Sequence, residues 1–162
     1  MKCVIDANIL IDLHNGEILS QLFDLELVVS TPDAVLDEMF EPDRNTLLDM
    51  GLQRMSLNPD QLLETIQIRA TDSRLSLGDC AAFVAARDGD LLLLTGDKRL
   101  RDRAKSASVP THGVLWILDK LDAANLLSPI ELANSLRKML TEGARLPANE
   151  CEKRFRRWSG TE

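Results

Sequence analysis

The chain has 162 residues, of which 44% are hydrophobic and 28% are charged, and its formal net charge is -7. This length and apolar content are sufficient for one compact domain with its own core, without disulfides or structural metal. The acidic excess excludes a protein that coats nucleic acid through bulk positive charge. It does not exclude a nuclease, because divalent ions supply positive charge where carboxylates would otherwise repel phosphate.

The cysteines and the apolar runs indicate the cellular compartment in which the protein is expected. Cys3, Cys80 and Cys151 are odd in number and scattered, which is typical of reduced packing residues rather than of a disulfide framework. No charged leader precedes a long apolar stretch, so we expect no secretion signal. No apolar run approaches the ~20 residues that a membrane-spanning helix requires. These features predict a cytoplasmic protein without a membrane span.

Short apolar runs alternate along the chain with longer segments of helical periodicity. Residues 2–6, 25–30 and 91–95 are expected to form buried strands, and a further short strand is expected around residues 109–112. This alternation is typical of parallel βαβ units. The predicted fold class is therefore α/β, a single domain with a central parallel sheet flanked by helices.

Capping signals predict where the helices begin. Ser30-Thr31-Pro32 combines a hydroxyl N-cap with a proline and should start the helix after the second strand. Three more helices are expected, over residues 60–72, from residue 76 through an alanine-rich segment, and from about residue 98. The buried side of the helix after the second strand is predicted to comprise Val35, Leu36, Met39 and Phe40.

The last third of the chain is helical in pattern. Residues 1–112 are expected to form the core of the domain and residues 113–162 a helical extension. Helix starts are indicated at Ser128-Pro129 and near Pro147, with a break at Gly143. Strand signals are too few for a second α/β domain, so these helices should pack on the same domain or on a partner.

Acidic residues occur where strands end or helices begin. Asp6 and Asp97 directly follow buried strands, and Gly96 is expected to let the chain turn sharply before the second. Ligand sites of open parallel sheets form at the carboxyl ends of the strands. We expect two more acids near the same edge. They are Asp79, in the first turn of its helix, and Glu38, within the helix that follows the second strand. Converging carboxylates repel one another unless a hard cation lies between them, and oxygen ligands suit Mg²⁺ or Mn²⁺.

Each acid also has a structural explanation. Asp79 completes a capping box with the serine three residues before it, and Asp97 is suited to N-cap the next helix. Acids on an amphipathic helix usually face water, and periodicity does not separate Glu38 from Asp37. Asp6 is the acid that packing explains poorly, because it ends a buried strand.

Four segments, in this order, resemble the motifs of the PIN-domain family of metal-dependent ribonucleases. Each lies at the end of the structural element expected there, and together they span roughly the first 110 residues. The matching segments are Val4-Ile5-Asp6-Ala7-Asn8, Thr31-Pro32-Asp33-Ala34-Val35-Leu36-Asp37-Glu38, Leu77-Gly78-Asp79-Cys80-Ala81-Ala82 and Leu93-Leu94-Thr95-Gly96-Asp97-Lys98.

The resemblance implies an endoribonuclease that uses Mg²⁺ or Mn²⁺ to hydrolyse RNA phosphodiester bonds. It selects Glu38 over Asp37, and it implies that Asn8 supports the first acid and Thr95 accompanies the last. The catalytic and metal-binding residues that it implies are Asp6, Glu38, Asp79 and Asp97.

The chain beyond residue 113 resembles a narrower, VapC-like branch of prokaryotic PIN domains. The similar stretches are Gly113-Val114-Leu115 and Thr141 to Pro147. Members of this branch act as toxins of type II toxin–antitoxin pairs. The resemblance therefore implies a cognate antitoxin chain that covers the acidic site, and a homodimer.

Two basic runs and two histidines complete the set of candidate residues. Lys98, Arg99 and Arg101 open one run, and residues 153–157 form the other. Such runs are usually solvated helix faces; the alternative is contact with RNA phosphates, which would position substrate without reading its sequence. His14 and His112 are far apart in the chain, so we do not expect them to act as an acid and base pair.

Two other functions stay open at this point. A PIN fold could serve as a protein-binding module without turnover, although the presence of all four acids argues against this. A haloacid-dehalogenase-like phosphohydrolase would also place an acid at the end of its first strand. Such enzymes begin with Asp-x-Asp, however, whereas Asn8 occupies the third place here.

Overall fold

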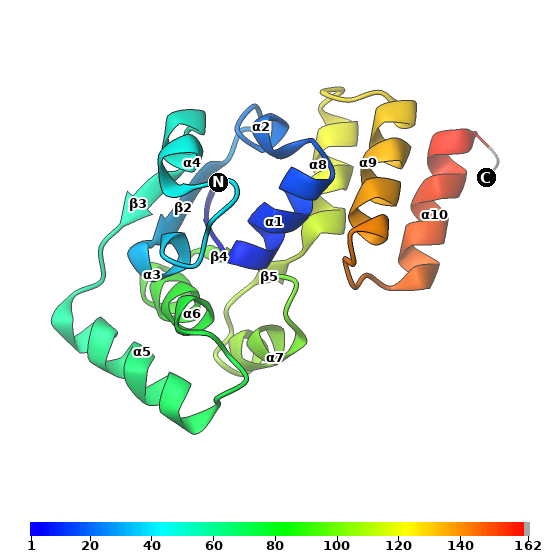
Figure 1. The fold of residues 1–162 in the computed structure, drawn as a ribbon. Helices are drawn as coiled ribbons and strands as arrows, with labels where there is room; N and C mark the ends of the chain where they lie inside the picture. Colours follow the sequence, from blue (N-terminus) through cyan, green and yellow to red (C-terminus); the bar gives the residue numbers. More distant parts are fainter. Residues whose placement is uncertain (161–162) are drawn as a thin grey trace.

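A computed structural model describes residues 1–160 of the chain. Its centre is a five-stranded sheet in which every pair of neighbouring strands is parallel, with helices on both sides (Figure 1). The α/β fold predicted from the alternation of strand and helix patterns is confirmed. The strands are β1 (Lys2–Ile5), β2 (Val28–Pro32), β3 (Gln53–Met55), β4 (Leu92–Leu94) and β5 (Thr111–His112).

Helices connect the strands and continue beyond the last one. Most begin at a residue whose side chain caps the first turn, as the sequence signals predicted for residues 76, 97 and 128. The helices are α1 (Ala7–Asn15), α2 (Leu19–Leu22), α3 (Asp33–Leu36), α4 (Arg44–Met50), α5 (Pro59–Thr71), α6 (Leu77–Gly89), α7 (Lys98–Ser106), α8 (Val114–Ala123), α9 (Pro129–Thr141) and α10 (Ala148–Ser159).

The strand order β3-β2-β1-β4-β5 puts β1 at the centre of the sheet. From β1 the chain builds outward through β2 and β3, and then returns to form β4 and β5 on the other side. Ligands of open α/β sheets bind at the carboxyl ends of the strands that flank such a reversal. Ile5 of β1 pairs with Leu94 of β4, so the residues after these two strands leave the sheet side by side.

The segment after β1 and α1 departs from the prediction in three ways. β2 continues through residue 32, so Thr31 is a buried strand residue and not part of a helix cap; its hydroxyl donates a hydrogen bond to the Ile5 carbonyl at 2.7 Å. α3 has only four residues, and Glu38 lies in the turn after it rather than within a helix. Phe40, predicted to be buried, is 89% exposed because the chain has left helical geometry before reaching it.

The core extends across the whole described chain. α6 packs across β1, β2 and β4, where its alanine-rich surface allows close approach. α1, α8 and α9 pack against one another on the other side of the strands (Figure 1). Leu118, Leu121, Leu132 and Leu136 are fully buried in the same cluster as the sheet residues. The C-terminal helices therefore pack on this chain, one of the two arrangements expected for them.

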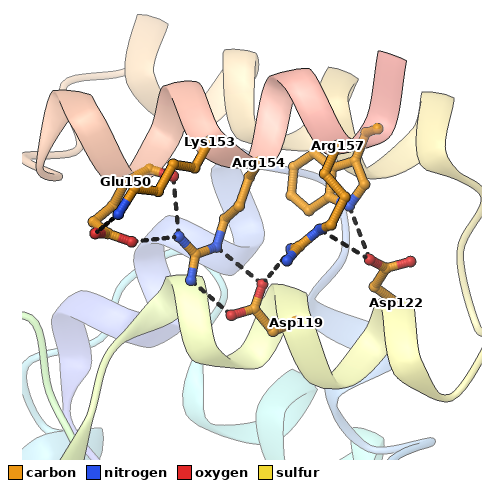
Figure 2. Close-up of polar contacts among 7 residues, drawn as sticks. Asp119, Asp122, Glu150, Lys153, Arg154 and Arg157 are labelled. Atoms are coloured by element: carbon orange, nitrogen blue, oxygen red, sulfur yellow. Dashed lines mark hydrogen bonds and ion pairs between the residues drawn. The ribbon is translucent and has the colours of Figure 1, made fainter. Parts of the chain in front are cut away.

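The last helix, α10, is bound to α8 by a cluster of ion pairs (Figure 2). Arg154 donates two hydrogen bonds to Asp119, at 2.9 and 2.6 Å, and its side chain is only 14% exposed. Arg157 donates to the same carboxylate at 2.7 Å, and the indole N–H of Trp158 donates to Asp122 at 3.0 Å. Bidentate pairs between arginine and carboxylate are among the stronger polar contacts. The cluster fixes α10 along α8.

No helix within residues 1–160 combines the length and the apolar character needed to cross a membrane.

Replacing Asp119 should loosen this attachment. In Asp119→Asn the charge that accepts from Arg154 and Arg157 is lost, so we expect the free energy of unfolding to fall by about 1–2 kcal/mol in urea denaturation. The control is Glu152→Gln, whose partner Arg156 is well exposed; it should change stability by less than about 0.5 kcal/mol. Equal losses in the two variants would contradict a special role for the cluster.

Candidate functional site

Asp6 occupies the centre of the edge where β1 and β4 end. Its backbone N–H donates to the Leu94 carbonyl at 3.0 Å, which continues the pairing of the two strands. Its carboxylate accepts from the Ile9 N–H at 3.0 Å and from the Thr95 hydroxyl, and the side chain is fully buried. Asp6 is thus the N-cap of α1, a structural role that sequence analysis did not assign to it.

Thr95 links Asp6 to Asp97. Its fully buried hydroxyl donates to the Asp6 carboxylate and accepts from the Asp97 N–H at 3.2 Å. The Asp97 carboxylate accepts from the Leu100 N–H at 2.9 Å and N-caps α7, as predicted. Gly96, between them, has no positive φ, so the chain passes from β4 to α7 here without a backbone conformation that requires glycine. One hydroxyl therefore joins the Asp6 carboxylate to the backbone of Asp97.

Asp79 reaches this edge from the start of α6. Its carboxylate accepts from the Ser76 N–H at 2.9 Å, and its own N–H donates to the Ser76 hydroxyl at 3.0 Å, which is the predicted capping box. Burial raises the pKa of Asp79, and the charges of Asp97 and Glu38 raise it further, against the hydrogen bonds from Ser76. The capping role and the proximity to other acids therefore coexist in one side chain.

Glu38 completes the group from the turn after α3. Its carboxylate accepts from the Gly78 N–H at 2.7 Å, a contact between residues 40 positions apart. A Cβ at Gly78 would lie 2.6–2.7 Å from the carboxylate atoms of Glu38, so only glycine leaves room for this contact. Asp37, by contrast, has a side chain that is 71% exposed and pairs with Arg44. The structure thus distinguishes two acids that periodicity could not separate.

The four carboxylates form an uncompensated acidic cluster. The pKa of Asp6 is raised to about 7, chiefly by burial; the hydrogen bonds that it accepts oppose the shift, and the charges of Asp79 and Asp97 add to it. Within residues 1–160, none of the four acids forms an ion pair with a lysine, arginine or histidine. Neighbouring carboxylates without a basic partner are stabilised by a bound cation.

The hydrogen bonds determine how these acids are oriented. In the described part of the chain, no three acidic, histidine or cysteine side chains are arranged to hold one metal ion. Each carboxylate instead accepts from a backbone N–H at a helix start. Mg²⁺ keeps several of its waters and is commonly bound through only one or two carboxylates, so this all-oxygen set of donors fits Mg²⁺ or Mn²⁺.

A pocket of about 800 Å³ adjoins the acidic cluster, and Asp97 and Asn8 are part of its lining. Asn8 is exposed on α1, and no hydrogen bond among the described residues joins it to Asp6. The structure therefore shows no hydrogen bond through which Asn8 would support Asp6, the role that the resemblance implied. Lys98, Arg99 and Arg101 of α7 line the same pocket.

Other reactive side chains are accounted for by packing. Cys3, Cys80 and Cys151 are buried free thiols, and burial raises the pKa of Cys3 and Cys80 to about 11, which keeps these thiols protonated and unreactive. His112 stacks on Trp116 with ring centroids 4.5 Å apart. Neither residue type supplies a group to the acidic cluster.

The sequence did not indicate how two further residues support the site. Gly78 provides both the N–H for Glu38 and the space for its carboxylate. Thr31 fixes the carbonyl of Ile5 immediately before Asp6. Both lie in segments that carry the family resemblance, but their contacts join distant parts of the chain, so no local pattern identifies them.

Comparison with known proteins agrees with this geometry. A family model described as a PIN domain, DUF3368, matches residues 2–160. The chain belongs to the PIN-domain family. No curated protein matches it. PIN domains are in general nucleases that use divalent metal ions. The match favours this family over the haloacid-dehalogenase-like alternative.

Exchanging single carboxylates for amides should separate Glu38 from Asp37. Glu38→Gln keeps an acceptor for the Gly78 N–H but removes a charge from the cluster, so we expect the affinity for Mn²⁺ to fall at least about 10-fold in titration calorimetry. Asp37→Asn removes the same charge one residue away, outside the cluster, and should bind Mn²⁺ as the wild type does. An equal loss in both variants would mean that only net charge matters.

Proposed function

We propose that this PIN domain is an endoribonuclease that hydrolyses RNA phosphodiester bonds with Mg²⁺ or Mn²⁺. The observation that carries the proposal is the acidic cluster at the reversal point of the sheet, where four carboxylates converge without a basic partner. A structural network would balance these charges with lysine or arginine. A site for a cation and a phosphate leaves them unbalanced until the ligand arrives.

The residues that would hold the ion are Asp6, Glu38, Asp79 and Asp97. A bound divalent ion lowers the pKa of a coordinated water and stabilises the charge that develops on phosphate oxygens. Hydrogen bonds within the chain hold these carboxylates in position. Thr95 holds Asp6 against Asp97, and the backbone N–H groups of Ile9, Gly78 and Leu100 hold three of the four carboxylates. The family resemblance implies products with a 5′-phosphate and a 3′-hydroxyl.

Asp6→Asn should abolish cleavage without unfolding the protein. The amide oxygen still caps α1 at the Ile9 N–H, while a buried charge is removed, so the metal-free variant should be at least as stable as the wild type. We expect its cleavage of a panel of structured RNAs in Mn²⁺ to fall at least about 100-fold. EDTA should abolish wild-type cleavage, and Asp37→Asn should retain it. Undiminished cleavage by Asp6→Asn would indicate a contaminant or a different site.

We also propose that the protein is the toxin of a type II toxin–antitoxin pair in the cytoplasm, and that it forms a homodimer. The support is the resemblance of residues 113–115 and 141–147 to that branch. The antitoxin would cover the acidic cluster.

Growth of a bacterial host tests the toxin proposal. Expression of the wild type should slow growth, whereas expression of Asp6→Asn to the same level should not, because only turnover harms the cell. Co-expression of a chain encoded beside this one should restore growth. Equal growth with both proteins, together with RNA cleavage by the purified wild type, would contradict the toxin role but not the nuclease activity. Absence of both cleavage and Mn²⁺ binding would favour a protein-binding module.

A further inference from the structure

The pocket beside the acidic cluster is lined by four parts of the chain, and two of them carry its cations. One part of its lining is the start of α7, with Asp97 at the acidic end and Lys98, Arg99 and Arg101 beyond it. Another is the α9–α10 loop, residues 143–147, which includes Arg145. Figure 1 shows this loop at the end of the C-terminal helices that lies toward α7. The pocket thus joins the proposed cleavage site to the C-terminal extension.

The loop is shaped locally to reach this position. Gly143 has a φ of +100°, a conformation that ends α9 and that L side chains rarely adopt. The N–H of the next residue, Ala144, donates a hydrogen bond to the Met139 carbonyl at 3.0 Å. The chain therefore leaves α9 abruptly, and Arg145 follows within two residues. Pro147 then caps α10, whose attachment to α8 anchors the far end of the loop.

The cations of this pocket are not used within the fold. The guanidinium groups of Arg101 and Arg145 are exposed and form no hydrogen bond or ion pair among residues 1–160. Lys98 pairs with Asp102 at 3.2 Å, but both side chains are largely exposed, and such pairs contribute little. The second basic run differs, because its cations are paired with acids of α8 and α10. The α7 run, unlike the second one, therefore contains arginines that pair with no acid among residues 1–160.

We propose that this pocket holds the RNA strand next to the cleaved phosphodiester, and that Arg145 positions the strand by contacting one of its phosphates. The inference rests on the proposed nuclease function. A cation in the acidic cluster balances the charge of one phosphate, but the next phosphates of the strand still face the carboxylates. Arg101 and Arg145 supply the positive charge that those phosphates need, in a chain whose net charge is -7.

The remaining lining fits one strand rather than a duplex. A volume of about 800 Å³ is in the range of pockets that enclose small ligands, so it accommodates a short run of nucleotides. Ile11, Leu115 and Leu146 offer apolar surface to the faces of bases. Asp12 also lines the pocket, and burial raises its pKa to about 6. A carboxylate there would repel phosphate, so the backbone of the strand should follow α7 and the α9–α10 loop instead of α1.

Binding and kinetics of Arg145→Gln test the inference. For a 12-nucleotide single-stranded RNA in EDTA, measured by fluorescence anisotropy, we expect Kd to rise about 3- to 10-fold, and the slope of log Kd against log salt to fall by about 0.7. In Mn²⁺, KM for the same RNA should rise while kcat is unchanged, because the reacting atoms are not touched. A dinucleotide, which ends before the pocket, should be cleaved equally by the variant and the wild type.

Two further variants separate a phosphate contact from other effects. Arg145→Lys keeps a positive charge in the loop and should recover most of the affinity. Arg156→Gln removes a charge from α10, outside the pocket, where Arg156 already pairs with Glu152; its Kd should equal that of the wild type. If Arg156→Gln weakens binding as much as Arg145→Gln, net charge alone explains the effect and the inference is overturned.

The outcomes for this inference and for the proposed function are distinguishable. RNA binding that depends on Arg145, without cleavage by the wild type, would support a phosphate contact at Arg145 but contradict the nuclease proposal, and with it the placement of the strand beside a cleaved bond. Cleavage with identical KM in wild type and Arg145→Gln would leave the nuclease proposal standing and overturn the inference. A glutamate-rich 12-residue peptide that binds as tightly as the RNA, with the same dependence on Arg145, would make the pocket a protein-docking groove and also overturn it.

Discussion

The in-register pairing of β1 with β4 determines where the acidic cluster of this PIN domain lies. Ile5 and Leu94 end their strands as neighbours, so Asp6 and Asp97 leave the sheet together although about 90 residues separate them. The Thr95 hydroxyl then holds the two acids in one hydrogen-bonded chain. The reversal of strand order at this point also directs the connecting helices away from the edge. A pocket lined in part by Asn8 and Asp97 lies at this edge.

Helix N-termini explain how four carboxylates coexist at this edge without basic partners. Asp6 is the N-cap of α1 and Asp97 is the N-cap of α7. In the first turn of α6, the Gly78 N–H donates to Glu38 and the Asp79 N–H donates to the Ser76 hydroxyl. Each N-terminus carries partial positive charge, which favours anions. This stabilisation is weaker than an ion pair, so the charge of the cluster stays largely unbalanced by the protein itself.

Some local features of the site were predictable from the sequence, although the N-cap role of Asp6 was missed, and the contacts of Glu38 with distant residues were not predictable. The capping roles of Asp79 and Asp97 follow from residues within three positions. The position of Glu38 depends on Gly78, 40 residues away. The helix before it, α3, has only four residues, which is too short to give a periodic pattern. β3 was missed because it lies at the sheet edge and its residues are largely exposed, with no apolar run to mark it. Convergence of the acids was expected from the strand ends of a parallel sheet, and the family resemblance selected Glu38 over Asp37.

The distribution of paired and unpaired cations connects the C-terminal helices to the site. Arg154 and Arg157 are bound to Asp119 and hold α10 against α8 (Figure 2). Because α10 is fixed at this surface, the preceding loop is anchored at both ends, and Arg145 is kept beside the pocket at modest entropic cost. The two groups of arginines thus have different functions on neighbouring elements. One group stabilises the fold by pairing internally, and the other, Arg101 and Arg145, pairs with no acid among residues 1–160 and lines the pocket beside the acidic cluster.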